Sequence, residues 1–432
     1  VQAMRLLAGA AVTPADAALA DPETAKWSQV IAGDFLAGVL AGLGDPDRLG
    51  PADPGPELRA TLRPYQQVGL KWLYLLDQLG LGGCLADDMG LGKTIQVLAL
   101  LLLKRKARQA AARPSLLVVP ASLLGNWQAE LRRFAPSLRV LIAHPSALPG
   151  AELAELGPAD LREIELCITS YGAVARYPVF AQDPWDLLIL DEAQAIKNPA
   201  AKQTRAVKAL RSRTRLVLSG TPVENRLGDL WSLYDFICPG LLGSAKVFSQ
   251  FTRRLAEKQD YGPLRRLIGP YLLRRLKSDK RIISDLPDKT ELVAYCGLSK
   301  RQAVLYEQAV AALREQLTQV EEGIQRRGVI LSFLLRFKQL CNHPSQWLGD
   351  GVYDPQDSGK FARLRELCEP IASRQERVLV FTQFRELTAP LAEFLRGVFG
   401  QPGLVLSGET PVKDRPALVQ AFQKELGSPF FV

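Results

Sequence analysis

The chain has 432 residues, of which 47% are hydrophobic and 23% are charged, a balance typical of a globular protein with room for roughly two or three domains. Its 54 Lys and Arg residues outnumber its 45 Asp and Glu residues, and the formal net charge of +9 favours a polyanionic partner. The 2 histidines and the 6 scattered cysteines argue against a zinc site, a Ser-His-Asp triad and a disulfide framework. Because the cysteines have no paired spacing, a reducing cytoplasm is the expected compartment, and the sequence shows no signal peptide or membrane-spanning run.

The first 56 residues are predicted to be an accessory segment followed by a linker. The segment is rich in Ala and Gly, and residues 51–56 cluster Pro, Asp and Gly in the manner of a linker. Because the chain begins with Val1 rather than Met, we expect it to start inside a longer protein.

The most informative segment is residues 85–94, with the sequence LADDMGLGKT. A tight turn that ends in Gly-Lys-Thr before a long apolar helix is typical of a phosphate-binding loop, whose backbone N–H groups surround the phosphates. In that geometry Lys93 would reach the outer phosphates and the Thr94 hydroxyl would bind Mg²⁺, while Asp87 stands where the usual pattern has Gly. The alternative is a Gly-rich turn that caps an ordinary helix. The candidate nucleotide-binding residues of the loop are Asp88, Met89, Gly90, Leu91, Gly92, Lys93 and Thr94.

Short apolar runs alternate with helical patterns after the linker. Continuous apolar runs indicate the strands of a parallel sheet that is covered on both faces. Such a sheet binds ligands at the carboxyl ends of its strands, which is where we expect the loop at 85–94 to lie. The predicted fold class is therefore α/β, and its predicted strands are residues 116–119, 166–169, 187–190 and 216–219.

The apolar run at 187–190 ends in two carboxylates, Asp191 and Glu192, about a hundred residues after Lys93, as a Walker-B element does. Asp191 would hold Mg²⁺ and Glu192 would polarise the attacking water, since phosphoryl transfer depends on metal charge and on a positioned nucleophile. Solvated loop carboxylates are the alternative for two acids at a strand end. Together, the loop and the acids make nucleotide hydrolysis the leading hypothesis.

Two later stretches, 229–281 and 299–342, have helical patterns. Four apolar residues at the second stretch are spaced as on one helix face, which predicts a stripe that packs in a core. These residues are Leu313, Leu317, Val320 and Ile324.

Basic residues are concentrated in two places, which we call the first and second basic clusters. The charge pattern leaves two interpretations open, contact with nucleic acid and a solvated face. The first cluster contains Arg205, Lys208, Arg211, Arg213 and Arg215, with no acid among them. The second contains Arg253, Arg254, Lys258, Arg265, Arg266, Arg274, Arg275, Lys277, Lys280 and Arg281.

The loop and the two acids belong to a longer series of short motifs along the chain. They are LRPYQ at 62–66, DDMGLGKT at 87–94, VPASLLGNW at 119–127, TSY at 169–171, DEAQ at 191–194, LSGTPVEN at 218–225, LLRR at 272–275, CNHP at 341–344, VFTQF at 380–384 and LSGETP at 406–411. As an ordered set this series resembles the Swi/Snf family of superfamily-two ATPases, and the resemblance covers roughly residues 58–432.

The resemblance implies two RecA-like lobes, each a parallel sheet flanked by helices, that bind ATP and Mg²⁺ and move along double-stranded DNA. Helical insertions would separate the motifs, and lobe two would be incomplete, with strands at 378–381 and 404–406 and another beginning at 429–432. The implied segments are 57–235 for lobe one, 236–345 for the helical insertions and the inter-lobe connection, and 346–432 for the partial lobe two.

The resemblance also implies roles for single residues. Gln66 would read adenine, and Lys93, Glu192 and Gln194 would act in catalysis, with Gln194 in a position where many relatives carry His. Ser219 and Thr221 would couple the nucleotide to DNA contacts. The residues that would follow the DNA backbone are Ser122, Asn126, Trp127, Ser170, Tyr171, Lys197, Gln383, Gly408 and Thr410. Core packing or loop capping is equally open for each of them singly, and for Trp127 core packing is the stronger alternative, because Trp is a frequent core residue.

The family's last two motifs supply arginines to ATP from lobe two and would lie beyond Val432. Because an arginine finger contributes about three to five orders of magnitude to turnover, we expect this chain to bind nucleotide and duplex DNA but to hydrolyse ATP slowly. Two alternatives remain open: a strand-separating helicase, and a nucleotide-binding scaffold that contacts DNA with an inactive motor. We expect a cytoplasmic monomer at the nucleoid, without membrane association, and DNA-bound proteins are a further class of candidate partner.

Overall fold

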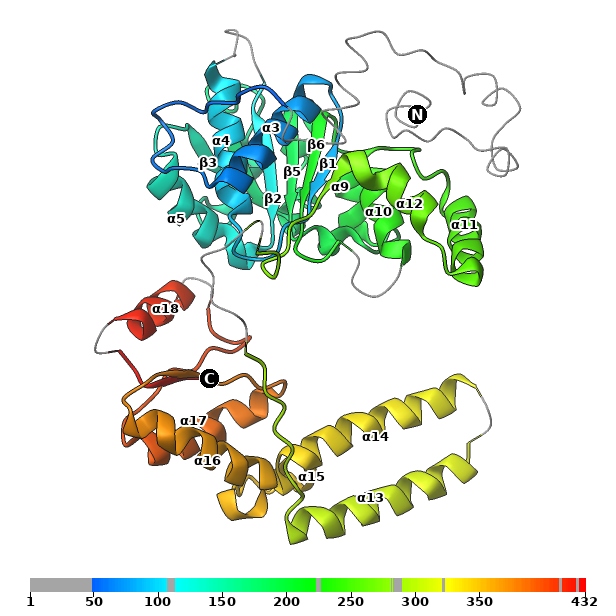
Figure 1. Ribbon diagram of the computed structural model, residues 1–432, viewed down its shortest axis with the longest axis vertical. Helices are drawn as coiled ribbons and strands as arrows, with labels where there is room; N and C mark the ends of the chain where they lie inside the picture. Colours follow the sequence, from blue (N-terminus) through cyan, green and yellow to red (C-terminus); the bar gives the residue numbers. More distant parts are fainter. Residues whose placement is uncertain are drawn as a thin grey trace. The chain divides into compact units, whose positions relative to one another are not determined.

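The computed structural model divides the chain into two compact units, Val1–Asp288 and Lys289–Val432, each with a hydrophobic core of its own (Figure 1). The division falls inside the segment 236–345 that was predicted to hold insertions and the connection. Most of the predicted accessory segment, residues 1–48, lies outside the described part of the chain. The structure describes residues 49–106, 113–222, 227–280, 282, 290–320, 323–411, 414–424 and 427–432.

Unit 1 is built on a 7-stranded parallel sheet with the strand order β3-β4-β2-β5-β6-β1-β7. The four strands predicted from apolar runs are confirmed as β2, β4, β5 and β6, and β5 and β6 begin earlier than predicted. The side chains of β2 and β4 are buried throughout, as are those of β5 except Asp186 and the last three of β6, which a sheet flanked by helices requires. The strands are β1 (Gly83–Leu85), β2 (Ser115–Val119), β3 (Val140–Ile142), β4 (Leu166–Ser170), β5 (Trp185–Asp191), β6 (Ser212–Leu218) and β7 (Leu272–Leu273).

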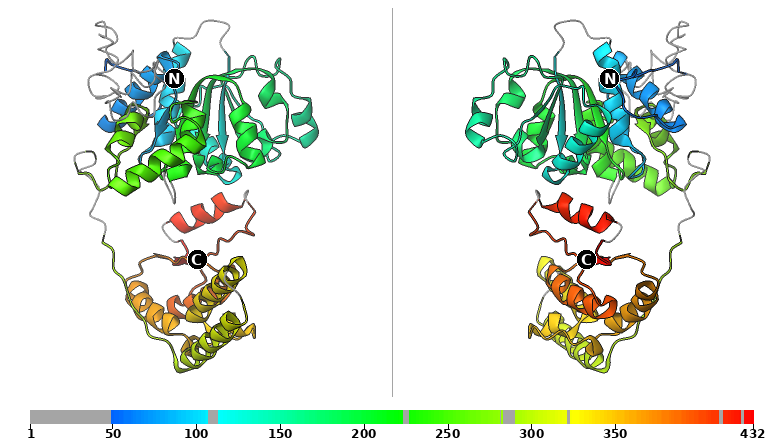
Figure 2. Two further views of the ribbon diagram at one scale, coloured as in Figure 1. Left: turned by 90° about the vertical axis from the view of Figure 1, so that its right-hand side faces the viewer. Right: turned by 90° about the vertical axis from the view of Figure 1, so that its left-hand side faces the viewer.

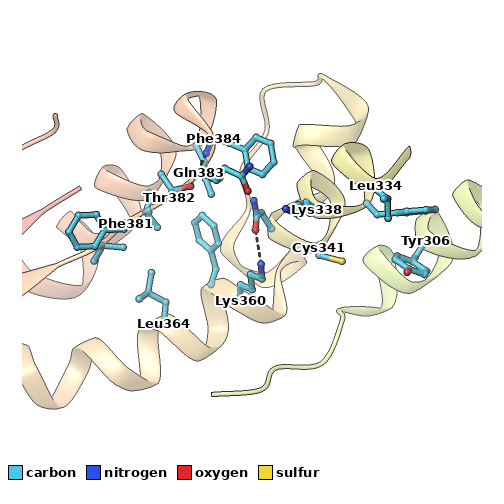
Figure 3. A pocket seen from close by; sticks show the side chains of 16 residues that line it. Tyr306, Leu334, Lys338, Cys341, Lys360, Leu364, Phe381, Thr382, Gln383 and Phe384 are labelled. Carbon is cyan, nitrogen blue, oxygen red and sulfur yellow. Dashed lines mark hydrogen bonds between the residues drawn. The ribbon is translucent and has the colours of Figure 1, made fainter. Parts of the chain in front are cut away.

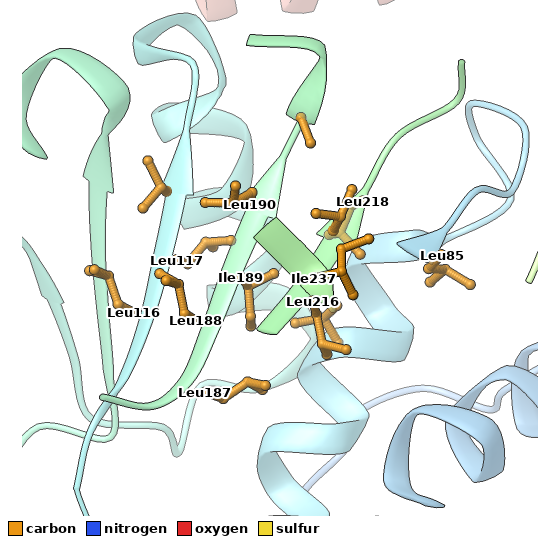
Figure 4. Close-up of a cluster of buried hydrophobic side chains, with 14 of the residues drawn as sticks. Leu85, Leu116, Leu117, Leu187, Leu188, Ile189, Leu190, Leu216, Leu218 and Ile237 are labelled. Carbon is orange, nitrogen blue, oxygen red and sulfur yellow. The ribbon is translucent and has the colours of Figure 1, made fainter. Parts of the chain in front are cut away.

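Helices flank this sheet, and apolar side chains of neighbouring strands fill the core together with Ile237 (Figure 4). None of the helices in the described ranges combines the length and the hydrophobicity that a membrane crossing requires. The α-helices of unit 1 are α3 (Pro64–Gln78), α4 (Lys93–Lys106), α5 (Leu124–Phe134), α6 (Gly150–Glu155), α7 (Tyr171–Val174), α8 (Val179–Gln182), α9 (Lys202–Ala209), α10 (Leu227–Ile237), α11 (Ala245–Lys258) and α12 (Gly262–Ile268). Short 3-10 helices cover Ala121–Leu123, Ala193–Ile196 and Gly269–Tyr271.

Unit 2 has a small parallel sheet of β8 and β9, against which Leu404 adds a single bridge to Phe431. Its core gathers Phe361, Cys368 and Phe394, among others. The elements are α13 (Lys300–Thr318), α14 (Ile324–Asn342), α15 (Pro344–Leu348), α16 (Gly359–Ser373), β8 (Val378–Leu379), α17 (Thr388–Phe399), α18 (Arg415–Gln423) and β9 (Phe430–Phe431), with 3-10 helices at Pro355–Asp357 and Arg385–Leu387.

Helices α13 and α14 lie side by side as a pair in all views (Figures 1 and 2). The predicted single stripe from Leu313 to Ile324 is therefore wrong, because α13 ends at Thr318 and Ile324 is the first residue of α14, with 88% of its surface exposed. Gly323, the residue before α14, has a φ of 147°, which is outside the helical range and open to glycine, so the backbone changes direction between the two helices.

Candidate active site

The predicted phosphate-binding loop joins the carboxyl end of β1 to the first residue of α4, Lys93. Gly90 and Gly92 have φ values of 80° and 77°, a left-handed conformation that favours glycine. A Cβ atom on Gly92 would lie 2.4 Å from the Gln66 amide nitrogen, so any larger residue would also displace the end of that side chain. The loop thus presents backbone N–H groups at a helix N-terminus, where anions are stabilised.

Lys93 lies folded against its own loop. Its Nζ donates hydrogen bonds to the carbonyl oxygens of Asp87, at 2.7 Å, and Asp88, at 3.3 Å. Within the same loop Met89 is 59% exposed and Leu91 is 1% exposed, so Leu91 anchors the turn in the core while Met89 faces solvent. The Lys93 ammonium is therefore held at the loop. When a nucleotide binds, phosphate oxygens can replace these carbonyl oxygens as its hydrogen-bond acceptors.

Asp87, the departure from the usual loop pattern, forms a buried ion pair with Arg275. Asp87 is 0% exposed and Arg275 is 6% exposed; the Arg275 Nε donates to Asp87 Oδ1 at 2.8 Å, and its Nη2 pairs with Oδ2. Gln96 on α4 donates to Asp87 Oδ2 at 3.3 Å and accepts from Arg275 Nη2 at 2.8 Å. From the sequence, Arg275 was predicted only as a member of the second basic cluster. The signal that could have identified it is Asp87, because a buried carboxylate needs a cationic partner.

The backbone around Arg275 runs alongside the loop as a continuation of β7. Ala86 N donates to Leu273 O at 2.7 Å, and Asp88 N donates to Arg275 O at 3.0 Å. Lys277 N donates to Asp88 Oδ2 at 2.9 Å. Residues 273–277 therefore hold the start of the loop through both backbone and side-chain bonds.

Gln66, the predicted adenine reader, lies near the start of α3 and is only 8% exposed. Its Oε1 accepts from the Arg63 backbone N–H at 2.9 Å, and its Nε2 donates to Leu91 O at 3.1 Å. The side chain thus links the start of α3 to the phosphate-loop candidate, and its contact with adenine stays a prediction.

Asp191 ends β5 and is almost fully buried, at 9% exposure. Its Oδ2 accepts from the Trp127 indole N–H at 2.7 Å, its Oδ1 accepts from the Glu192 N–H at 2.9 Å, and its carbonyl oxygen accepts from the Tyr171 hydroxyl at 2.7 Å. Burial raises the pKa of Asp191 above its usual value, and the neighbouring charge of Glu192 adds to this, although the Trp127 hydrogen bond acts in the opposite direction.

Glu192 has φ 48° and ψ 54°, a left-handed conformation that is uncommon for a residue with a side chain and stores roughly 1–3 kcal/mol of strain. Its Oε2 accepts from the Gln194 amide at 2.7 Å, and the Ser219 hydroxyl reaches Gln194 Oε1 at 3.4 Å. Ser219 Oγ in turn accepts from the Thr221 N–H at 3.1 Å. The predicted coupling residues at the end of β6 are thereby linked to the predicted general base at the end of β5.

The donor atoms at this sheet edge suit magnesium. Among the residues that the structure describes, no cluster of three or more His, Cys, Asp or Glu side chains could hold a metal by itself. Mg²⁺ characteristically takes only one or two carboxylates and completes its shell with water and substrate phosphates. Asp191 and the hydroxyl of Thr94, at the start of α4, are hard oxygen donors that fit this pattern.

The predicted DNA-contacting residues of unit 1 fall into two groups. Ser122, Asn126 and Lys197 are exposed, and Asn126 donates to Glu130 Oε1 at 3.3 Å. The other group is buried: Trp127, Ser170 and Tyr171 are 1%, 5% and 4% exposed. Ser170 accepts from the Ala173 N–H as the N-cap of α7. Their predicted contact with the DNA backbone would require these side chains to leave the core.

In unit 2, Gln383 and Gly408 are exposed, and Thr410 Oγ1 accepts from the Ser407 N–H at 3.0 Å. Gln383 also lines a cavity of about 680 Å³ between α14 and the segment that follows β8 (Figure 3). Apolar side chains make up much of its wall, and Lys360 donates to Asn342 Oδ1 at 2.7 Å beside it.

The two basic clusters have different surroundings. In the first, Lys208 pairs with Asp235 at 2.7 Å and Arg213 Nη2 pairs with Asp77 at 2.6 Å. The cluster contains no acid of its own, but these two side chains form ion pairs with acids that are distant in sequence. In the second, most of the side chains on α11 and α12 are exposed, and Arg281 lies outside the described residues. The exposed basic residues of those two helices are Lys246, which precedes the cluster in sequence, and Arg253, Arg254, Lys258, Arg265 and Arg266.

The comparisons with known proteins agree on one family. Residues 65–346 match the SNF2-related domain. The "Putative ATP-dependent helicase/translocase YwqA" of Bacillus subtilis is 40% identical over 379 residues, which cover 86% of this chain and 40% of that protein. The human "SWI/SNF-related matrix-associated actin-dependent regulator of chromatin subfamily A member 1" is 34% identical over 385 residues, covering 85% of this chain and 36% of the relative. The chain thus spans well under half the length of these curated relatives.

A solved structure, "Sulfolobus solfataricus SWI2/SNF2 ATPase core in complex with dsDNA", superposes with a TM-score of 0.50 at 37% identity. The match covers 89% of this chain and 79% of that chain. The predicted α/β architecture with a parallel sheet flanked by helices is therefore confirmed by both the strand order and the structural match.

Proposed function

The chain belongs to the SNF2 family, and from this premise we propose that it is an ATP-hydrolysing motor that moves along double-stranded DNA. The observation that carries the proposal is the sheet edge of unit 1, where Lys93, Asp191 and Glu192 follow the carboxyl ends of parallel strands. Brought together with the helix N-terminus of α4, these groups can bind a phosphate chain, hold a divalent cation and position a water molecule.

The residues of the site divide this work. Lys93 and the loop N–H groups bind the phosphates, and Thr94 with Asp191 holds Mg²⁺, which neutralises charge on the transferred phosphoryl group when it is bound. Glu192 orients and polarises the attacking water, and its short bond to Gln194 fixes the carboxylate. Gln66 contacts the adenine, and Ser219 and Thr221 couple this site to DNA.

Duplex DNA as the partner is supported by the archaeal SWI2/SNF2 ATPase core, whose structure was solved in complex with dsDNA, and by the surface of unit 1. Ser122, Asn126 and Lys197 are exposed, and hydroxyl, amide and ammonium groups are the ones that contact DNA phosphates. The exposed basic residues of α11 and α12 provide a second positively charged surface. In unit 2, the proposed contacts with the DNA phosphodiester backbone are made by Gln383, Gly408 and Thr410. The proposed location is the bacterial cytoplasm, and the proposed acting form is a monomer.

The test is ATP hydrolysis measured with duplex DNA, single-stranded DNA and RNA as cofactors. A duplex translocase is stimulated chiefly by the duplex, whereas a strand-separating helicase responds at least as strongly to single strands. Lys93→Ala and Glu192→Gln should each abolish the stimulated rate. DNA-linked function that survives both substitutions would instead identify a nucleotide-binding scaffold, and the proposal would then be wrong.

A further inference from the structure

Two aromatic side chains that sequence analysis assigned to DNA are bonded to the predicted metal ligand. The Trp127 indole N–H donates to Asp191 Oδ2 at 2.7 Å, and the Tyr171 hydroxyl donates to the carbonyl oxygen of the same residue at 2.7 Å. Trp127 is 1% exposed and Tyr171 is 4% exposed, so in this arrangement neither presents its polar atom to an external ligand.

Each aromatic residue lies on the inner side of a turn whose outer side is exposed. Trp127 lies in the first turn of α5, where Gly125 and Asn126 are exposed, and Tyr171 starts α7, where Gly172 is exposed. These turns follow the carboxyl ends of β2, which pairs with β5, and of β4, which pairs with β2 on its other side. A displacement of either turn by a surface ligand would therefore act directly on Asp191.

We propose that Trp127 and Tyr171 are positioning residues that transmit DNA occupancy of the α5 and α7 turns to the metal-binding geometry of Asp191. This inference rests on the function proposed above and gives these two residues a different role from backbone contact. The exposed neighbours on each turn contact the DNA, while the Trp127 indole orients the Asp191 carboxylate and the Tyr171 hydroxyl holds the main chain of the same residue.

The hydrogen-bond geometry explains how this works. Asp191 Oδ1 accepts from the Glu192 N–H at 2.9 Å while Oδ2 accepts from Trp127, so the carboxylate is held at both oxygens and its plane is fixed. A partner that orients a metal-binding carboxylate typically contributes about 10- to 100-fold to metal affinity. Loss of the Trp127 N–H leaves Oδ2 without its donor in a buried site, so the carboxylate is held at Oδ1 alone and its plane is no longer fixed.

The closing experiment compares Trp127→Phe with Trp185→Phe in the full chain. Trp185 is the matched control, because it starts the same strand β5, is 2% exposed and donates its indole N–H to Phe180 O at 2.9 Å. Each substitution therefore removes one buried N–H donor and a similar volume. Three quantities are measured: Tm, affinity for a DNA duplex, and Mn²⁺ affinity by electron paramagnetic resonance with a non-hydrolysable ATP analogue, with and without that duplex.

We expect both variants to lose Tm to a similar extent and to bind the duplex as the wild type does. Only Trp127→Phe should weaken Mn²⁺ binding, by about 10- to 100-fold, and abolish the effect of the duplex on it. Tyr171→Phe, which keeps the ring and removes the bond to the Asp191 carbonyl, should weaken the duplex effect in the same direction and provides the test if Trp127→Phe does not fold.

Wild-type Mn²⁺ affinity in both Trp127→Phe and Tyr171→Phe, with the duplex effect intact, would overturn the coupling. Duplex affinity that falls while Mn²⁺ affinity is retained would overturn it as well and restore these residues as DNA ligands. If the wild type binds neither the Mn²⁺–nucleotide complex nor duplex DNA, the proposed function fails, and the coupling fails with it. The first two results leave the proposed function standing, so the two kinds of failure are distinguishable.

Discussion

Removal of the Arg275 charge is expected to destabilise unit 1 strongly. Arg275→Met keeps much of the side-chain length but leaves the Asp87 carboxylate, which is 0% exposed, with only the Gln96 amide and the Arg275 N–H as donors. Breaking a buried ion pair by removing one partner costs about 3–5 kcal/mol, because the other charge is left uncompensated. At about 2–4 °C per kcal/mol for a large domain, Tm should fall by about 6–20 °C.

The assay is thermal unfolding combined with thiol labelling of Cys84. Cys84 lies on β1, where it pairs with Leu272 of β7, and burial raises the pKa of its thiol to about 12, so it reacts only when this part of the sheet opens. Arg275→Met should therefore speed labelling at this position, as measured by mass spectrometry. Loosening of β7 also loosens residues 273–277 from the loop, so nucleotide affinity should fall in parallel.

Two controls make the result specific. Arg274→Met changes the exposed neighbour and should alter stability by no more than about 0.5 kcal/mol. In the double variant Asp87→Asn, Arg275→Met no charge is left unpaired, so its loss should be smaller than the sum of the two single losses. If Arg275→Met costs less than about 1 kcal/mol, or no more than Arg274→Met, the Asp87 carboxylate does not depend on the Arg275 charge.

Lys93→Ala should weaken nucleotide binding by about 10- to 100-fold in an equilibrium titration, because charge-assisted hydrogen bonds to phosphate are lost; unchanged affinity would remove Lys93 from the site. Glu192→Gln should retain nucleotide binding but lower single-turnover hydrolysis by about 10²- to 10⁴-fold, since a general base is removed; a wild-type rate would exclude that role. Burial raises the pKa of Asp186, but the hydrogen bond from Arg213 and the charge of Lys104 outweigh it, so the pKa lies below 3.8. The folded state therefore binds this proton less tightly than the unfolded state, and the stability it contributes is present above pH 3.8 and lost as pH falls through the lower folded value. In urea titrations at a series of acidic pH values, Asp186→Asn should lose stability less steeply than the wild type, and parallel slopes would contradict the assignment.

The sheet and the loop could be predicted because their physical requirements are local. A strand buried on both faces needs a continuous apolar run, which is why 116–119, 166–169, 187–190 and 216–219 were found. The short strands β1, β3 and β7 did not stand out as strands, since two or three residues carry little periodicity. The loop and the acids of β5 follow from short-range chemistry and were recognisable for the same reason.

What could not be predicted depends on partners distant in sequence. The first basic cluster contains no acid, yet Arg213 pairs with Asp77, which lies in α3. Trp127 and Asn126 are adjacent in sequence, but one is buried against Asp191 and the other is exposed, a distinction set by the packing of α5 on the sheet. Arg275 likewise lies beside the loop only because β7, the strand that precedes it, pairs with β1.

We propose that a nucleotide held at the carboxyl ends of β1 and β5 is hydrolysed in response to duplex DNA. The most direct measurement is phosphate release from ATP in a single turnover, with the wild type and Glu192→Gln, each with and without a DNA duplex. We predict that the duplex accelerates the wild type and that Glu192→Gln removes this acceleration. Wild-type phosphate release at the same rate with and without the duplex, or acceleration that persists in Glu192→Gln, would contradict the claim.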